Sequence, residues 1–81
     1  MSFPYYEVQF KPKKLKNGKY KARCSISEHE GDRVTVILSR WELKKDGFEN
    51  KNIANRMMGF NAIRFLKIEH GVKDLNQIRF V

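Results

Sequence analysis

The sequence predicts a single α+β domain, in which a three-stranded antiparallel meander packs against one C-terminal α-helix. Three observations lead to this fold class. Alternating apolar and polar residues fill three segments of the first half, the tight-turn pair Asn17 and Gly18 separates the first two, and a helical apolar pattern fills the second half. We expect a sheet over about 5–43, a helix over about 49–70 and a tail over 71–81, which could add a short fourth strand.

The first two strands form a predicted hairpin. The first strand covers about Tyr5–Phe10 and could continue to Leu15. Pro12 implies an edge position, a bulge or a strand break, because proline cannot donate a hydrogen bond to a ladder. The second strand covers about Lys19–Ser27. Since Asn17 and Gly18 both tolerate positive φ, we expect a type I′ turn between these strands.

The third strand is predicted over about Arg33–Trp41, after a polar turn with Gly31 as its hinge. Its β-branched residues are typical of a strand, and their alternation places Val34, Val36 and Leu38 on one face. We expect this face to lie toward the helix. The apolar faces of the other two strands complete the predicted core side of the sheet: Tyr6, Val8, Phe10, Tyr20, Ala22 and Ile26.

One amphipathic helix is predicted in the second half of the chain. It begins between Gly47 and Asn52, where Asn50 is one of several candidate N-caps, and ends near His70 before Gly71. Placed at 100° intervals, the apolar residues form one broad stripe, which we expect to pack on the sheet. The stripe consists of Ile53, Ala54, Met57, Met58, Phe60, Ala62, Phe65 and Ile68.

The charge balance is strongly basic. Seventeen Lys and Arg residues against nine Asp and Glu residues give a net charge of +8. Such a charge favours binding to nucleic acid, to an anionic membrane or to an acidic protein, and it does not by itself choose among them. A solubilising surface without a ligand is the simplest alternative.

The sequence also predicts the cellular compartment and the absence of some chemistries. The single cysteine, Cys24, cannot form an internal disulfide and fits a reducing, cytoplasmic location. We expect no signal peptide and no membrane span, because the apolar runs are only a few residues long. His29 and His70 have no nucleophile pattern around them, so we expect no enzyme, no metal site and no cofactor.

The densest charge lies around the predicted hairpin, where residues 8–27 carry seven basic residues and no acid. Because the helix covers one face of the sheet, the other face stays open, and we expect Arg23 and Arg33 to project from it on neighbouring strands. These two could reach guanine edges in duplex DNA while lysines contact phosphates. The candidate nucleic-acid-binding residues are Lys11, Lys13, Lys14, Lys16, Lys19, Lys21, Arg23, Arg33 and Thr35.

Two other interpretations of this cationic region stay open. Lysine on an edge strand also guards against aggregation, and outward strand positions are polar in any case. Tyr5, Tyr20 or Trp41 could stack on unpaired bases of single-stranded DNA or RNA. This second option ranks below duplex DNA, because the alternation places Tyr20 on the core side.

Two short motifs suggest a family. The run from Asn17 to Arg23 reads Asn-Gly-Lys-Tyr-Lys-Ala-Arg, and after an alternating strand come Gly47, Phe48, Lys51 and Ala54. Together they resemble the arm-type DNA-binding domain of phage-type tyrosine recombinases. The resemblance covers about 11–66, and it implies a three-stranded sheet on one helix, with the sheet entering the major groove of DNA.

A protein-interaction module is the main alternative function. The apolar stripe of the helix could exceed what three short strands cover, and Met57, Met58 and Phe60 would then form a docking surface. Such a protein would be a homodimer, or a small phage- or plasmid-type inhibitor or adaptor whose cations meet an acidic surface.

Overall fold

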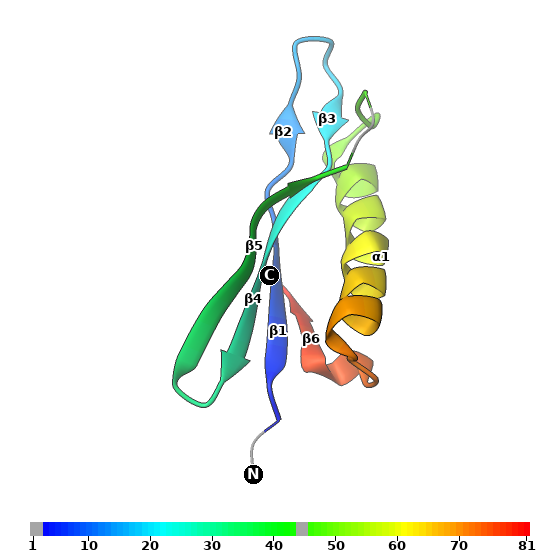
Figure 1. Ribbon diagram of the computed structural model, residues 1–81. Helices are drawn as coiled ribbons and strands as arrows, with labels where there is room; N and C mark the ends of the chain where they lie inside the picture. Colours follow the sequence, from blue (N-terminus) through cyan, green and yellow to red (C-terminus); the bar gives the residue numbers. More distant parts are fainter. Residues whose placement is uncertain (1–2, 44–45) are drawn as a thin grey trace.

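The computed structural model describes residues 3–43 and 46–81, and it confirms the α+β class with one long helix. A four-stranded sheet forms one layer, and the helix covers one face of it (Figure 1). No helix of the described residues is both long and apolar enough to cross a membrane. The elements are β1 (Tyr5–Phe10), β2 (Lys13–Lys14), β3 (Tyr20–Lys21), β4 (Arg23–Glu30), β5 (Arg33–Glu42), α1 (Lys51–His70), a 3-10 turn (Leu75–Gln77) and β6 (Ile78–Phe80).

The predicted three-stranded meander is only part of the sheet. Its strands are β1, β4 and β5, which pair antiparallel, but the full order is β5-β4-β1-β6. The tail adds β6 parallel to β1, with Tyr6 opposite Ile78, and the Val81 amide donates to the Val8 carbonyl at 2.9 Å. The short fourth strand that the tail could add is therefore present, and it makes the sheet mixed.

The hairpin departs from the prediction at its turn and along its second strand. That strand is interrupted, so that β2 and β3 form a separate two-stranded sheet beyond the break at Pro12. The type I′ turn is wrong, because Gly18 has a φ of 83° and no described residue other than glycine has positive φ. Leu15 and Lys19 close a three-residue loop instead, and the Lys19 amide donates to Asn17 Oδ1.

Two bulges shift the register of β5, and the predicted faces are wrong for Val34 and Val36. Ile26 lies opposite Leu38, but the next residue, Ser27, lies opposite Val36, so that β5 holds one extra residue here. A second such shift lies between Cys24 and Ile26. Since a slip of one residue exchanges the two faces of a strand, Leu38 stays on the helix side, whereas Val36 does not. Val34 and Val36 are 57% and 60% exposed, on the face away from the helix.

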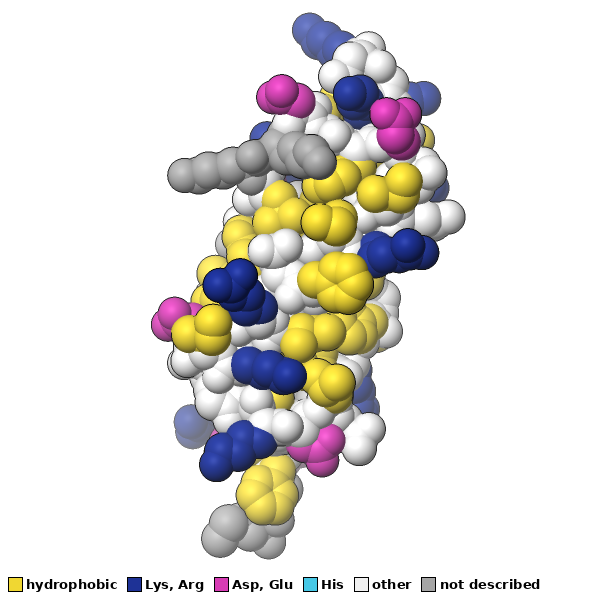
Figure 2. Space-filling view, turned by 90° about the vertical axis from the view of Figure 1, so that its right-hand side faces the viewer, with side chains coloured by type: hydrophobic (Ala, Val, Ile, Leu, Met, Phe, Trp, Pro, Cys, Tyr) yellow, Lys and Arg dark blue, Asp and Glu magenta, His cyan; other side chains and the backbone are white. Residues whose placement is uncertain are grey.

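The helix has the predicted extent but not the predicted breadth of contact. Asn50 is the N-cap, since its Oδ1 accepts from the Ile53 amide at 3.0 Å, and Gly71 ends the helix with a φ of 63°. Apolar side chains run down the outer surface of α1 (Figure 2). Four apolar residues of this surface, which the prediction placed in the core, are exposed in the structure: Ile53, Met57, Phe60 and Ile68.

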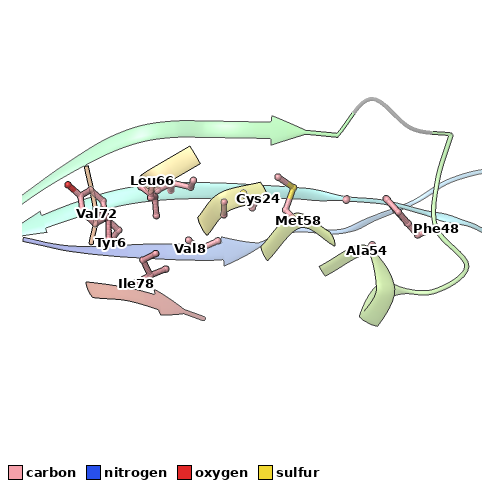
Figure 3. Close-up of a cluster of buried hydrophobic side chains, with 12 residues drawn as sticks. Tyr6, Val8, Cys24, Phe48, Ala54, Met58, Leu66, Val72 and Ile78 are labelled. Carbon is pink, nitrogen blue, oxygen red and sulfur yellow. The ribbon is translucent and has the colours of Figure 1, made fainter. Parts of the chain in front are cut away.

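The core is one narrow row between helix and sheet. α1 contributes side chains at every fourth position, Ala54, Met58, Ala62 and Leu66, all with no exposed surface. They lie against the centre of β1 and β4, as Figure 3 shows for Met58 and Leu66. Both alanines bring the helix close to the strands, so that this row makes the fully buried part of the contact, and Ile63 and Phe65 pack at its margin.

Two core side chains, Tyr6 and Cys24, make the fold less stable at alkaline pH. Burial, the hydrogen bond to Glu28 and nearby acidic charge raise the pKa of Tyr6 from 10.0 to about 12, and burial raises the pKa of Cys24 from 9.0 to about 11. Between about pH 9 and 12 the unfolded chain loses protons that the folded chain keeps. The free energy of unfolding therefore falls as pH rises through this window.

Urea unfolding at pH 8, 9, 10 and 11 measures this fall. In Cys24→Ala the decline between pH 9 and 11 should be shallower than in the unmodified protein, whatever the variant loses at pH 8. An unchanged decline would contradict the assignment to the thiol.

Candidate nucleic-acid interface

Five exposed lysines lie on the projecting hairpin at one end of the molecule. The chain is elongated, with extents of 48, 21 and 17 Å, and the sheet of β2 and β3 extends past the end of α1 (Figure 1). Within the described residues no ion pair joins any of these lysines to an acid. We call residues 11–19 the lysine hairpin, and its exposed lysines are Lys11, Lys13, Lys14, Lys16 and Lys19.

The lysine hairpin is fixed at its base by the segment that enters α1. Tyr20 and Phe48 exchange two backbone hydrogen bonds of 2.8 Å, each amide donating to the other's carbonyl. The preceding Gly47 is buried with a φ of 129°, and it packs against Lys19 and Leu15. These contacts hold the projecting strands in one orientation relative to the helix.

An acid lies at the base of the hairpin, although residues 8–27 contain none. Glu42, at the end of β5, has its carboxylate 3.2 Å from the Lys21 ammonium and 3.7 Å from the Arg23 guanidinium. The hydrogen bond from Lys21 lowers the pKa of Glu42, burial opposes it, and the attraction of Lys21, Arg23 and Lys13 lowers this pKa further. Arg23 Nε also donates to the Lys11 carbonyl at 3.0 Å, so that this guanidinium is held against the protein.

The expected pairing of Arg23 with Arg33 on one surface is wrong. Arg23 lies opposite Glu42 at one end of the β4–β5 ladder, and Arg33 lies opposite Glu30 at the other end. With a rise of about 3.3 Å per residue, the two ends are about 23 Å apart. Thr35 lies near Arg33, opposite Glu28, so neither residue shares a surface with the lysine hairpin.

Several side chains on the open face of the sheet contact one another. The Tyr5 and His29 rings stack with centroids 4.6 Å apart, and the Arg79 guanidinium lies 3.9 Å from the centre of the Tyr5 ring. Glu7 lies 3.8 Å from His29, and the exposed Val34 and Val36 belong to the same face. A face with an acid and exposed valines suits a polyanion less than the hairpin does.

The aromatic residues considered for base stacking are engaged within the protein. Trp41 lies on the helix side of the sheet, with its ring 5.4 Å from that of Phe65. Tyr20 packs against the core, and Tyr5 has the two ring contacts already described. The exposed phenylalanine rings of the described residues are Phe3, Phe60 and Phe80, none of which the prediction considered for base stacking.

Comparisons with protein-family models, with curated proteins and with solved structures found no match to this chain. The resemblance to arm-type DNA-binding domains therefore stays a prediction. Within residues 3–43 and 46–81, no cluster of three His, Cys, Asp or Glu residues could hold a metal ion.

Glu42 is the residue of this site that sequence reasoning missed. Its position at the end of the predicted third strand was the available signal, because an antiparallel neighbour places that end beside the start of the second strand. Its face was assigned wrongly, because alternation puts Glu42 on the same face as Val34, which the prediction placed on the core side. The two one-residue shifts in β5 cancel between these residues, so that both lie on the face away from the helix.

Gly47→Ala tests the anchoring of the hairpin. A Cβ at this position would lie 2.8 Å from Lys19 Cβ and 3.1 Å from Leu15 Cδ1, in a backbone conformation that is strained for alanine. We expect a loss of about 2 kcal/mol in the free energy of unfolding and faster hydrogen exchange at the Tyr20 and Phe48 amides. Gly18→Ala is the matched control, because it adds similar strain with no atom within 4 Å. Equal effects of the two variants on these amides would contradict the anchoring role.

Proposed function

We propose that this protein binds nucleic acid, with duplex DNA as the preferred ligand, and that the lysine hairpin is the contact surface. The observation that carries the proposal is the set of five exposed lysines on a projecting two-stranded hairpin, none of which forms an ion pair with an acid among the described residues. Each phosphate that a lysine neutralises releases counterions and so favours binding. A two-stranded ribbon also fits the major groove, which is about 12 Å wide.

The structure favours the hairpin over the open sheet face as the surface that meets DNA. No hairpin lysine lies within ion-pair distance of a described acid, whereas the sheet face contains Glu7 and two exposed valines. In this proposal the lysines position the protein on phosphates, and Arg33 and Thr35 have no part in the same contact. The resemblance to arm-type DNA-binding domains supports the same class of ligand, and a cytoplasmic location belongs to the proposal.

A protein-interaction module is the second candidate function, favoured by the exposed apolar surface of α1 (Figure 2). Met57 is 38% exposed and Phe60 is 61% exposed, whereas Met58 is fully buried and cannot dock. The same helix carries Arg56 and Arg64, which would repel a second copy and favour an acidic partner. A mass that rises with concentration in sedimentation would favour a homodimer instead.

A matched pair of double variants tests the lysine hairpin. Lys14→Gln with Lys16→Gln should weaken binding to a 20-base-pair duplex and lower the slope of log affinity against log salt by about 0.9 per lost contact. Lys67→Gln with Lys73→Gln removes the same charge at the other end of the molecule and should change the slope little. Fluorescence anisotropy at several salt concentrations measures both. Equal weakening by the two pairs would remove the hairpin from the proposal, and no DNA retention at low salt would overturn the proposal itself.

Glu42→Gln tests the base of the hairpin in the opposite direction. The substitution keeps the shape of the side chain and releases Lys21 and Arg23 from their carboxylate. We expect tighter DNA binding at low salt and a steeper salt dependence, because two more cations become available to phosphates. Glu7→Gln, which removes one acid from the open face of the sheet, is the control for net charge. Equal gains from both variants would show a long-range charge effect and contradict a local role of Glu42.

A further inference from the structure

A hollow of about 300 Å³ lies between α1 and the edge of the sheet formed by β1 and β6. Three phenylalanine rings line it. Phe10 and Phe80 lie nearly parallel, with ring centroids 5.6 Å apart and planes 9° apart, and Phe60 contributes a ring that is 61% exposed. The hollow therefore presents flat apolar walls that are open to a ligand.

Gly59 keeps this hollow open. It lies on the row of α1 that faces the edge of the sheet, where a side chain would enter the space beside the rings. A Cβ at Gly59 would be 3.5 Å from Phe10 Cζ and 3.7 Å from Phe80 Cε1, which is ordinary contact distance. Glycine in a helix interior is about 1 kcal/mol less favourable than alanine in peptide measurements. A Cβ would fit at this position, so packing alone does not explain why residue 59 is glycine.

Polar groups border the apolar walls on one side. Asn52, Asn55 and Arg56 come from the first two turns of α1 and line the same hollow. The Oδ1 atom of Asn55 is buried and has no hydrogen-bond partner within the described residues. The terminal torsion of asparagine is soft, so this amide can turn to meet a ligand. An apolar slot bordered by an amide oxygen without a partner suits a flat ligand that carries donors and acceptors on its edge.

The charge of the lining favours an anionic ligand. Among the described residues, Arg56 is the charged residue that lines the hollow, and no Asp or Glu lines it. A flat group in the hollow therefore has a cation beside it on the helix side.

We propose that this hollow accepts an unpaired nucleobase of the nucleic acid that the lysine hairpin binds. The inference rests on the proposed function and sharpens it: the preferred ligand is duplex DNA with an unpaired base beside the paired region. The base stacks against Phe60, Asn55 meets its polar edge, and Arg56 meets the adjoining phosphate. An aromatic side chain of an acidic protein has a similar shape but lacks an edge that carries both donors and acceptors beside a phosphate.

The experiment compares two ligands, a blunt 20-base-pair duplex and the same duplex with a short single-stranded extension that contains 2-aminopurine. We expect the extension to bind more tightly and the 2-aminopurine emission to change on binding. Phe60→Ala should weaken binding of the extended duplex about tenfold, abolish the emission change and leave blunt-duplex affinity within twofold. Met57→Ala, on the same helix but outside the hollow, is the control and should change neither. Both side chains are partly exposed, so both variants should keep the circular dichroism spectrum of the unmodified protein.

The two ligands separate the two proposals. Binding of the blunt duplex with no emission change from the extension would overturn the base-binding hollow and leave the proposed function in place. If the blunt duplex does not bind, the proposed function falls. A titration with adenosine monophosphate, followed at the Asn55 and Gly59 amides by NMR, then tests the hollow alone, and unshifted amides would overturn it. Larger shifts with an acidic tyrosine-containing peptide than with the nucleotide would assign the hollow to a protein partner and also overturn the inference.

Discussion

The rest of the structure depends on a single row of helix–sheet contact. Ala54, Met58, Ala62 and Leu66 lie one turn apart on α1 and pack on the middle of β1 and β4. Each large side chain buried there stabilises the fold by about 1.5–3 kcal/mol, and a chain of 81 residues has few others to bury. Because the fully buried contact is narrow, it leaves the outer surface of α1 exposed and the tip of the projecting hairpin beyond the core.

Because the core is narrow, the residues that pack in it and the charged residues of the hairpin lie in different parts of the molecule. The five lysines of the hairpin lie beyond the core, where nothing requires them to be paired or buried. Lys21 and Arg23, which are nearer the core, lie beside Glu42, and this carboxylate neutralises part of their positive charge. The lysines of the hairpin, unlike Lys21 and Arg23, lie within ion-pair distance of no described acid, so their charge stays available to phosphates in the proposed DNA contact.

The same narrowness explains the hollow beside α1. β6 has only three residues and covers β1 from Tyr6 to Val8, so that Phe10 lies beyond the paired part of this edge. Its ring is covered by Phe80 and by the helix next to Gly59 rather than by a further strand. An aromatic slot beside a cationic ribbon thus follows from a sheet that stops short of the helix N-terminus. Both proposed contacts depend on this one boundary of the sheet.

Local patterns in the sequence determined the elements, and long-range contacts decided their faces. The helix with its Asn50 cap and Gly71 end, the break at Pro12 and the exposed lysines all follow from residues close together in the chain. Alternation also gave the correct faces of β1 and β4, where no bulge intervenes. Alternation did not predict the face of β5 or the pairing of Glu42 with Lys21 and Arg23. It also did not predict the distance between Arg23 and Arg33 or the hollow at Phe10. Strand register and bulges arise from cross-strand packing, and one extra residue reverses every face beyond it, so only the tertiary structure decided which side chains meet.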